Sequence, residues 1–128
     1  MPDDQKTILV VDDDPDAIDF FVTVLEDNGF ATVTARDGNE ALERLGDGPP
    51  PDLVTLDITM PEKSGVGVYR KLREDEKYQG IPVLIITGVS DDFKQFISTR
   101  RQVPPPEGYL SKPVEPSDLL GKVRELLG

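Results

Sequence analysis

Four short apolar segments of this sequence run into polar residues whose side chains could act together. The polar residues are Asp12, Asp13, Asp14, Asp57, Thr87 and Lys112. Carboxylates bind divalent cations, and a carboxylate can also act as a nucleophile. An amine and a hydroxyl can neutralise or hydrogen-bond the oxygens of a phosphoryl group. Taken singly, Asp14 and Thr87 are ordinary helix caps and Lys112 an ordinary surface lysine, so the chemistry requires a fold that brings them together.

The apolar segments predict strands, because each is short and bounded by turn-forming residues. The predicted strands cover residues 8–11, 30–35, 53–57, 81–87 and 108–111. The more alternating pattern of 30–35 favours an edge position. Helical spacing follows each strand, so five strands alternate with five helices. This pattern predicts an α/β fold with a doubly wound, five-stranded parallel sheet in the order 2-1-3-4-5, of the flavodoxin-like kind.

Several residues predict how the helices begin and which faces they bury. Asp14 and Pro15 suit the start of the first helix, and Asp37 with Glu40 resembles a capping box at the second. In the helix after Gly65 the expected buried residues are Val66, Tyr69 and Leu72. The residues expected on its charged, opposite face are Arg70, Lys71, Arg73 and Glu74. A fourth helix is expected from Asp91 and a fifth from Pro116.

Composition excludes several classes of function. The chain has 14 Lys+Arg against 25 Asp+Glu, a net charge of -11, which opposes direct binding to nucleic acid or to an anionic membrane. It has no cysteine and no histidine, which removes thiolate metal sites and Ser-His-Asp catalysis. No secretory signal or membrane-spanning run is visible. We expect one domain, residues 1–128, in the cytoplasm.

The clustered carboxylates predict a cation site made of oxygen ligands. Carboxylates that meet at one sheet edge repel one another and need a cation, and with no histidine or cysteine Mg²⁺ is expected, or Mn²⁺. A calcium-binding EF-hand loop is rejected, because Ala17 and Thr23 stand where that loop needs Gly and Glu. No GxxxxGK loop is present, so a phosphoryl group would come from another molecule.

Four segments together resemble the receiver domain of response regulators in two-component signal transduction. They are Ile8–Pro15, Leu56–Pro61 with Gly65, Ile81–Thr87 and Tyr109–Pro113. Each motif alone is weak, but their order and spacing match the family over nearly the whole chain. The resemblance implies a CheY-like fold and a protein that is phosphorylated on an aspartate.

The resemblance also implies a role for individual residues at the cation site. Asp57 matches the phospho-acceptor and also a metal ligand. Asp13 matches the direct Mg²⁺ ligand, and Asp12 matches the acidic neighbour that acts mainly through water. Thr59 matches the position whose backbone carbonyl completes the metal site.

Other matching positions concern the phosphoryl group and the response to it. Lys112 matches the phosphate-binding lysine and Thr87 the switch hydroxyl. Tyr109 matches the switch aromatic. The side chains of Thr59 and Val89 match positions that tune the lifetime of the phosphoryl group.

The implied function is a phosphorylation-controlled switch rather than a turnover enzyme. The phosphoryl donor would be a histidine kinase or a histidine phosphotransfer protein. The surface that changes would be the fourth helix, fifth strand and fifth helix, read by an unknown downstream protein. We expect a monomer and leave open whether it dimerises on phosphorylation. Two alternatives are a docking scaffold that needs no phosphorylation and, against the residue pattern, a phosphatase with an aspartyl nucleophile.

One segment departs from the family pattern. A triple proline, Pro104–Pro106, precedes the fifth predicted strand, and Thr87 and Lys112 are further apart than the resemblance leads us to expect. It is interpreted either as a stiff connector or as part of a remodelled output surface.

Overall fold

One parallel sheet organises the structure. The computed structural model describes residues 5–57, 65–87, 108–111 and 114–127, and the side chains at 65–68, 87, 109 and 111 lie outside that description. The strands are β1 (Thr7–Val11), β2 (Ala31–Ala35), β3 (Leu53–Asp57), β4 (Val83–Thr87) and β5 (Gly108–Ser111). All pairings are parallel, in the order β2-β1-β3-β4-β5. The predicted fold class and strand order are confirmed, with β2 at an edge.

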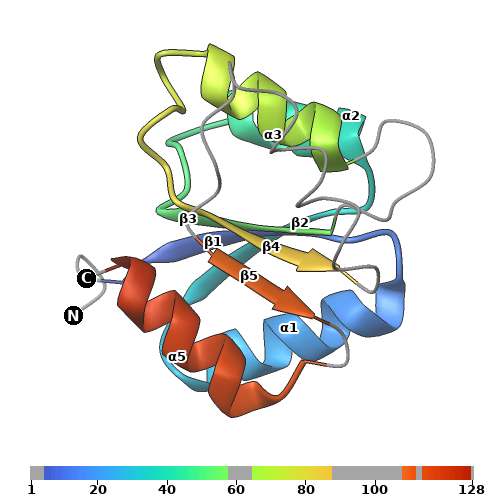
Figure 1. The fold of residues 1–128 in the computed structure, drawn as a ribbon, viewed down its shortest axis with the longest axis vertical. Helices are drawn as coiled ribbons and strands as arrows, with labels where there is room; N and C mark the ends of the chain where they lie inside the picture. Colours follow the sequence, from blue (N-terminus) through green and yellow to red (C-terminus); the bar gives the residue numbers. More distant parts are fainter. Residues whose placement is uncertain (1–4, 58–64, 88–107, 112–113, 128) are drawn as a thin grey trace.

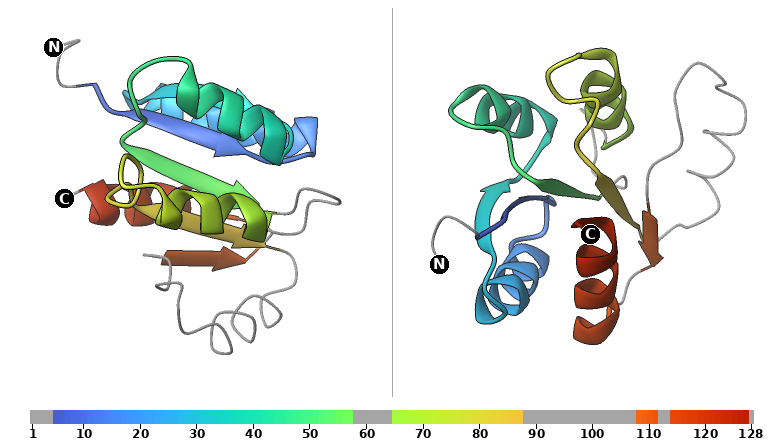
Figure 2. Two further views of the ribbon diagram at one scale, coloured as in Figure 1. Left: turned by 90° about the horizontal axis from the view of Figure 1, so that it is seen from above. Right: turned by 90° about the vertical axis from the view of Figure 1, so that its left-hand side faces the viewer.

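Helices cover both faces of this sheet. They are α1 (Pro15–Asp27), α2 (Gly38–Gly46), α3 (Gly65–Glu74) and α5 (Pro116–Leu127). Figures 1 and 2 show α2 and α3 on one face and α1 and α5 on the other. The helix expected from Asp91 falls outside the described residues.

Two apolar cores lie between the sheet and these helices, because successive side chains of a strand point to opposite faces. On the α2–α3 side, Leu9, Val11 and Leu56 pack with Leu45 and Leu72. The cluster on the α1–α5 side contains Ile8, Val10, Phe21, Leu25, Leu53, Leu84, Leu119 and Val123. A strand buried on both faces reads as a continuous apolar run, which is why β1 and β3 are so easily recognised in the sequence.

The ends of the described chain lie together at one end of the sheet. β1 begins at Thr7, and α5 runs back beside the sheet to end at Leu127. Figures 1 and 2 place both at the amino ends of the parallel strands. The carboxyl ends, where the polar residues of interest lie, form the opposite edge.

Both predicted helix caps are present. The Asp14 carboxylate accepts a hydrogen bond from Asp16 N at 3.0 Å, and the Asp37 carboxylate accepts one from Glu40 N at 2.8 Å. The Glu40 carboxylate accepts in return from Arg36 N at 3.0 Å, one residue before the expected partner. Each cap satisfies a backbone donor that the first turn of a helix leaves without an intrahelical partner.

The strand boundaries differ from the prediction by one or two residues. β4 begins at Val83 rather than Ile81, β2 at Ala31 rather than Phe30, and β1 at Thr7. Pro82 cannot donate a backbone hydrogen bond, and it instead accepts one from Val54 N at 3.1 Å just before β4 begins. None of the helices in the described ranges has the length and apolar character needed to cross a bilayer.

One prediction about α3 is wrong. Arg73, expected on the exposed charged face, is only 9% exposed. Its guanidinium donates to Gln79 O at 2.8 Å and Ile81 O at 3.0 Å, and it lies 5.1 Å from the centroid of the Tyr69 ring. A long side chain can bury its stem and still satisfy its charged end, here by binding the backbone of the turn that leads into β4.

We expect Arg73→Ala to lower the free energy of unfolding by about 2–3 kcal/mol, because it leaves two carbonyls of that turn without their donor. Lys71→Ala is the matched control, since Lys71 is a basic residue of the same helix and is exposed. Urea denaturation of both variants checks the prediction. A loss below about 0.5 kcal/mol for Arg73→Ala would be the value for an ordinary surface residue and would contradict it.

Candidate functional site

The sheet brings two of the predicted acidic residues together. β1 and β3 are neighbours, and their register pairs Val11 with Leu56. One step further along both strands, the same register places Asp12 opposite Asp57. The site therefore lies where the strand order reverses, at the carboxyl ends of the strands, as expected for an open parallel sheet.

Three carboxylates form a cluster at this position. One oxygen from each of Asp12, Asp13 and Asp57 lies within 4.8 Å of the others. Asp12 is 1% exposed and Asp57 is 2% exposed, whereas Asp13 is exposed. The cluster thus has a buried floor and a side open to water.

The β1–α1 turn holds this cluster in place. Asp12 N donates to Ala35 O of β2 at 3.1 Å. The Asp12 Oδ1 atom accepts a hydrogen bond from Asp14 N at 2.9 Å. This is an Asx-turn, in which an aspartate side chain accepts from the backbone N–H two residues later. We predicted Asp14 only as a helix cap, and this bond was missed although the Asp-x-Asp spacing signals it.

The donor set fits a hard divalent cation. The two buried carboxylates repel each other by about 3–4 kcal/mol at an effective dielectric constant near 20 if both are ionised at about this separation. A divalent cation would offset that repulsion. Mg²⁺ binds carboxylate oxygens and keeps several of its waters, which suits a cluster with one open side. No ion is part of the structure, so the fit rests on the ligands alone.

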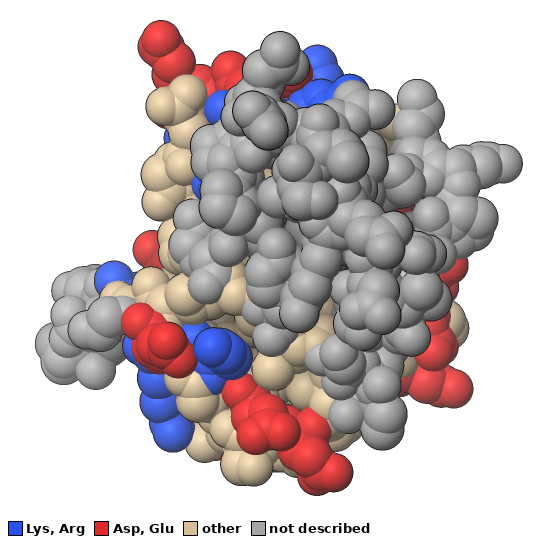
Figure 3. Space-filling view, in the orientation of Figure 1, with Lys and Arg blue, Asp and Glu red and all other residues tan. Residues whose placement is uncertain are grey.

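The surface charge near the cluster has the sign that attracts cations. The exposed acidic residues at the start of α1 are Asp13, Asp14, Asp16 and Asp19. Figure 3 shows acidic side chains along much of the lower edge of the visible face, the side on which α1 and α5 lie, with basic side chains beside them at the lower left. Such a field raises the local concentration of cations and opposes the approach of polyanions.

The backbones of two further predicted residues lie in neighbouring strands. Thr87 is the last residue of β4, one position beyond the Asp57–Ile86 pair, and its backbone pairs with Ser111 of β5. Tyr109 lies in β5 opposite Ile85. The backbone of Thr87 therefore ends at the same edge as Asp57, but neither predicted side chain is among those described.

The remaining predicted site residues fall outside the described ranges. They are Thr59, Val89 and Lys112. The segment Pro104–Pro106 falls outside them as well. Their roles stay predictions.

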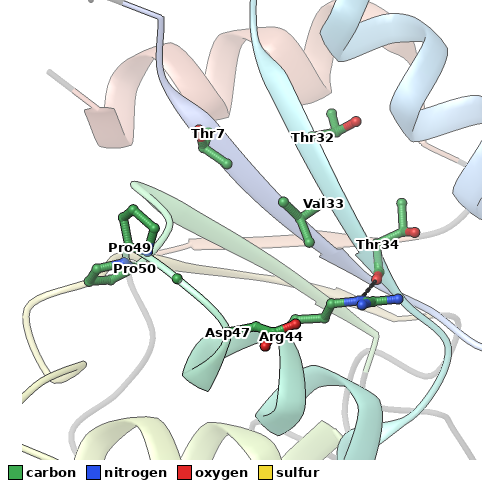
Figure 4. A pocket seen from close by; sticks show the side chains of 9 residues that line it. Thr7, Thr32, Val33, Thr34, Arg44, Asp47, Pro49 and Pro50 are labelled. Carbon is green, nitrogen blue, oxygen red and sulfur yellow. Dashed lines mark hydrogen bonds between the residues drawn. The ribbon is translucent and has the colours of Figure 1, made fainter.

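A separate cavity of about 510 Å³ lies at the open edge of β2. Its lining includes Thr7, Val33, Arg44, Pro49 and Pro50, so it lies against β2, the end of α2 and the loop before β3 (Figure 4). Arg44 Nε donates to Thr34 O at 3.2 Å, and both residues line this cavity (Figure 4). The cavity shares no residue with the carboxylate cluster, and we assign no ligand to it.

Comparison with known proteins identifies one family. The model of the response regulator receiver domain matches residues 8–124. The DNA-binding response regulator MtrA of Mycolicibacterium smegmatis is 34% identical over 123 residues, covering 96% of this chain and 51% of that protein. The phosphate regulon transcriptional regulatory protein PhoB of Escherichia coli is 31% identical over 124 residues, covering 95% and 52%. The chain thus spans about half the length of the curated relatives it matches.

Solved structures agree with this result. The chemotaxis protein CheY4 of Vibrio cholerae superimposes with a TM-score of 0.84 at 28% identity, covering 95% of this chain and 98% of that one. A CheY-like receiver domain protein from Methanospirillum hungatei gives 0.83 at 28% identity, covering 96% and 94%. These likenesses cover nearly all of each chain and support the fold.

We expect Asp57→Asn to raise the free energy of unfolding of the metal-free protein by about 1–3 kcal/mol, because it removes one of two buried like charges. Excess Mg²⁺ should stabilise the wild type and have little effect on the variant. Urea denaturation with EDTA and with MgCl₂ measures both effects. Asp47→Asn, an exposed acid outside the cluster, is the control and should respond to Mg²⁺ like the wild type. Equal stabilisation of all three proteins would place the cation elsewhere.

Proposed function

The chain belongs to the response regulator receiver domain family of two-component signalling, and from this premise we propose that it accepts a phosphoryl group on Asp57. The observation that carries the proposal is the buried Asp57 carboxylate within a three-carboxylate cluster at the carboxyl edge of the sheet. Asp57 ends a strand that is otherwise apolar but for Thr55. Packing alone would favour an apolar residue at this buried position, so an aspartate here favours a chemical role for its carboxylate.

The proposed reaction is a transfer of the phosphoryl group from a phosphohistidine to Asp57. A carboxylate oxygen of Asp57 forms a bond to phosphorus while the phosphorus–nitrogen bond breaks. The electron pair of that bond leaves with the imidazole nitrogen, and the product is an acyl phosphate. The chain has no histidine, so the phosphohistidine would lie outside this sequence, on a histidine kinase or a histidine phosphotransfer protein.

The carboxylate cluster would hold the cation that this transfer needs. When bound, Mg²⁺ supplies positive charge to the transferring oxygens. Asp13 and Asp57 would contact it directly, Asp12 through water, and Thr59 through its backbone carbonyl. Mn²⁺ suits the same oxygen ligands.

Three other residues would act on the phosphoryl group or respond to it. Lys112 would neutralise its oxygens, and the Thr87 hydroxyl would donate a hydrogen bond to one of them. Tyr109 would turn inward as Thr87 moves. Thr59 and Val89 would set how readily water reaches the acyl phosphate, and hence its lifetime.

The output would be a change in the surface formed by the fourth helix, β5 and α5. Phosphorylation adds charge and strong acceptor oxygens at one point and so shifts an existing equilibrium between two conformations. The relatives named above include DNA-binding regulators, but this acidic domain would act through a protein partner and would not bind DNA itself. It would work in the cytoplasm as a monomer, with dimerisation on phosphorylation left open. It would promote its own phosphorylation and dephosphorylation without turning over other substrates.

Two alternatives remain distinguishable. A docking scaffold would keep the fold without needing Asp57. That alternative does not explain why the chain has all three carboxylates together with Thr87 and Lys112. An aspartyl-nucleophile phosphatase would need a general acid two positions after the nucleophile, and that position is Thr59.

Incubation with Mg²⁺ and acetyl phosphate should add one phosphoryl group per chain, at Asp57, because that carboxylate is the proposed nucleophile. Intact-protein and peptide mass spectrometry measure the number and position of the modification. The Asp57→Asn variant should remain unmodified, as should the wild type in EDTA. Release of phosphate from many ester substrates would favour the phosphatase, and an unmodified wild type would favour the scaffold.

Thr87→Ala should separate phosphorylation from the response to it. The variant keeps Asp57 and the cluster, so it should still be modified, but it lacks the hydroxyl that would draw β4 toward the phosphoryl group. Hydrogen exchange of β5 and α5, with and without beryllofluoride, measures the response. Thr87→Ser retains the hydroxyl and serves as control. A full response in Thr87→Ala would remove Thr87 from the switch.

A further inference from the structure

Asp13 has an unusual position among the three clustered carboxylates. Unlike Asp12, it is exposed. Within the described part of the chain, no hydrogen bond or ion pair reaches its carboxylate, whereas Asp12 Oδ1 accepts from Asp14 N. The direction of the Asp13 side chain therefore depends on the backbone on either side of it.

The backbone is anchored on both sides of Asp13. Before it, Asp12 N is bonded to Ala35 O of β2 at 3.1 Å. After it, Asp14 makes three hydrogen bonds: its N donates to Asp12 Oδ1, its O accepts from Ile18 N at 3.0 Å, and its side chain accepts from Asp16 N at 3.0 Å. The two bonds to Ile18 and Asp16 fasten Asp14 to the first turn of α1.

We propose that Asp14, through its cap on α1, is a positioning residue for the cation site and sets its preference for Mg²⁺ over Ca²⁺. This inference rests on the proposed function of the cluster. The cap bond between the Asp14 side chain and Asp16 N holds the Asp14 backbone at the first turn of α1. Because Asp13 directly precedes Asp14, the position of the Asp14 backbone limits the directions that the Asp13 side chain can take. Asp14 itself need not touch the cation.

The preference between cations follows from their different demands on geometry. Mg²⁺ requires ligands close to the corners of an octahedron, whereas Ca²⁺ accepts more ligands at variable angles. A turn that loses one anchor lets the Asp13 carboxylate sample more directions. Mg²⁺ binding should then weaken more than Ca²⁺ binding, so the ratio of the two affinities should fall.

A change of charge alone would have a different effect. Removing the Asp14 charge weakens attraction for both ions, and because both are divalent their affinities should fall in proportion. The affinity ratio therefore separates positioning from electrostatic attraction.

The test compares Asp14→Ala with Asp14→Asn and Asp14→Ser in the full chain. All three remove the charge, but Asn and Ser are strong N-cap residues and Ala is not. Calorimetric titration with MgCl₂ and with CaCl₂ gives both dissociation constants for each protein. In Asp14→Ala we expect the Mg²⁺ constant to rise, by up to about tenfold if the full free energy of the cap is transmitted to the site. The Ca²⁺ constant should rise less, and Asn and Ser should restore the ratio.

Asp37→Ala is the matched control, because it removes the same kind of cap and the same charge from α2. It should reduce stability about as much as Asp14→Ala and leave the Mg²⁺ to Ca²⁺ ratio unchanged. A lower ratio in this control would mean that general loss of stability causes the effect, which overturns the proposal.

Other outcomes also decide the matter. An unchanged ratio in Asp14→Ala, or proportional loss for both ions in all three variants, overturns the role of Asp14 and leaves the proposed function intact. If the wild type binds no Mg²⁺, both the role of Asp14 and the proposed function are overturned. The titration of the wild type gives this result before any variant is compared.

Discussion

The burial of two neighbouring carboxylates is the constraint on which the site of this structure depends. Asp12 and Asp57 lie side by side because β1 and β3 are adjacent and in register. Burying such a pair costs free energy unless a cation or a hydrogen-bond network compensates. The apolar cores on both faces of the sheet supply the stability that keeps them there. The fold thus buries two acidic side chains where packing alone would favour apolar ones, which is common where a fold is used for chemistry.

Sequence alone predicted the sheet well, for identifiable reasons. β1, β3 and β4 are buried on both faces, so their runs are apolar apart from Thr55 in β3, and their polar ends stand out. Once five strands alternate with helices, few topologies remain, and the order places β1 beside β3. The acidic cluster could therefore be predicted from strand ends without knowing any distance. The cap residues were predicted equally well, because a cap depends on a few neighbouring residues only.

The errors concern side chains that bind backbone groups. Arg73 has the spacing of an exposed residue, but the carbonyls of Gln79 and Ile81 draw its guanidinium inward. The bond from Asp14 N to Asp12 Oδ1 was missed for a different reason: the Asp-x-Asp spacing is typical of it, but Asp14 was assigned only the role of a helix cap. In both cases a side chain binds backbone groups, and for Arg73 the position of those groups is defined only by the folded chain.

The placement of the two described chain ends has a consequence for the architecture of larger proteins. Thr7 and Leu127 lie at the amino end of the sheet, across the whole length of the strands from the carboxylate cluster. Polypeptide joined at either end would depart from the side opposite the reacting edge, leaving that edge accessible to a docking donor. The same geometry makes both ends suitable points for genetic fusion or surface immobilisation. A unit of this kind can be exchanged between proteins without redesign of its reactive side.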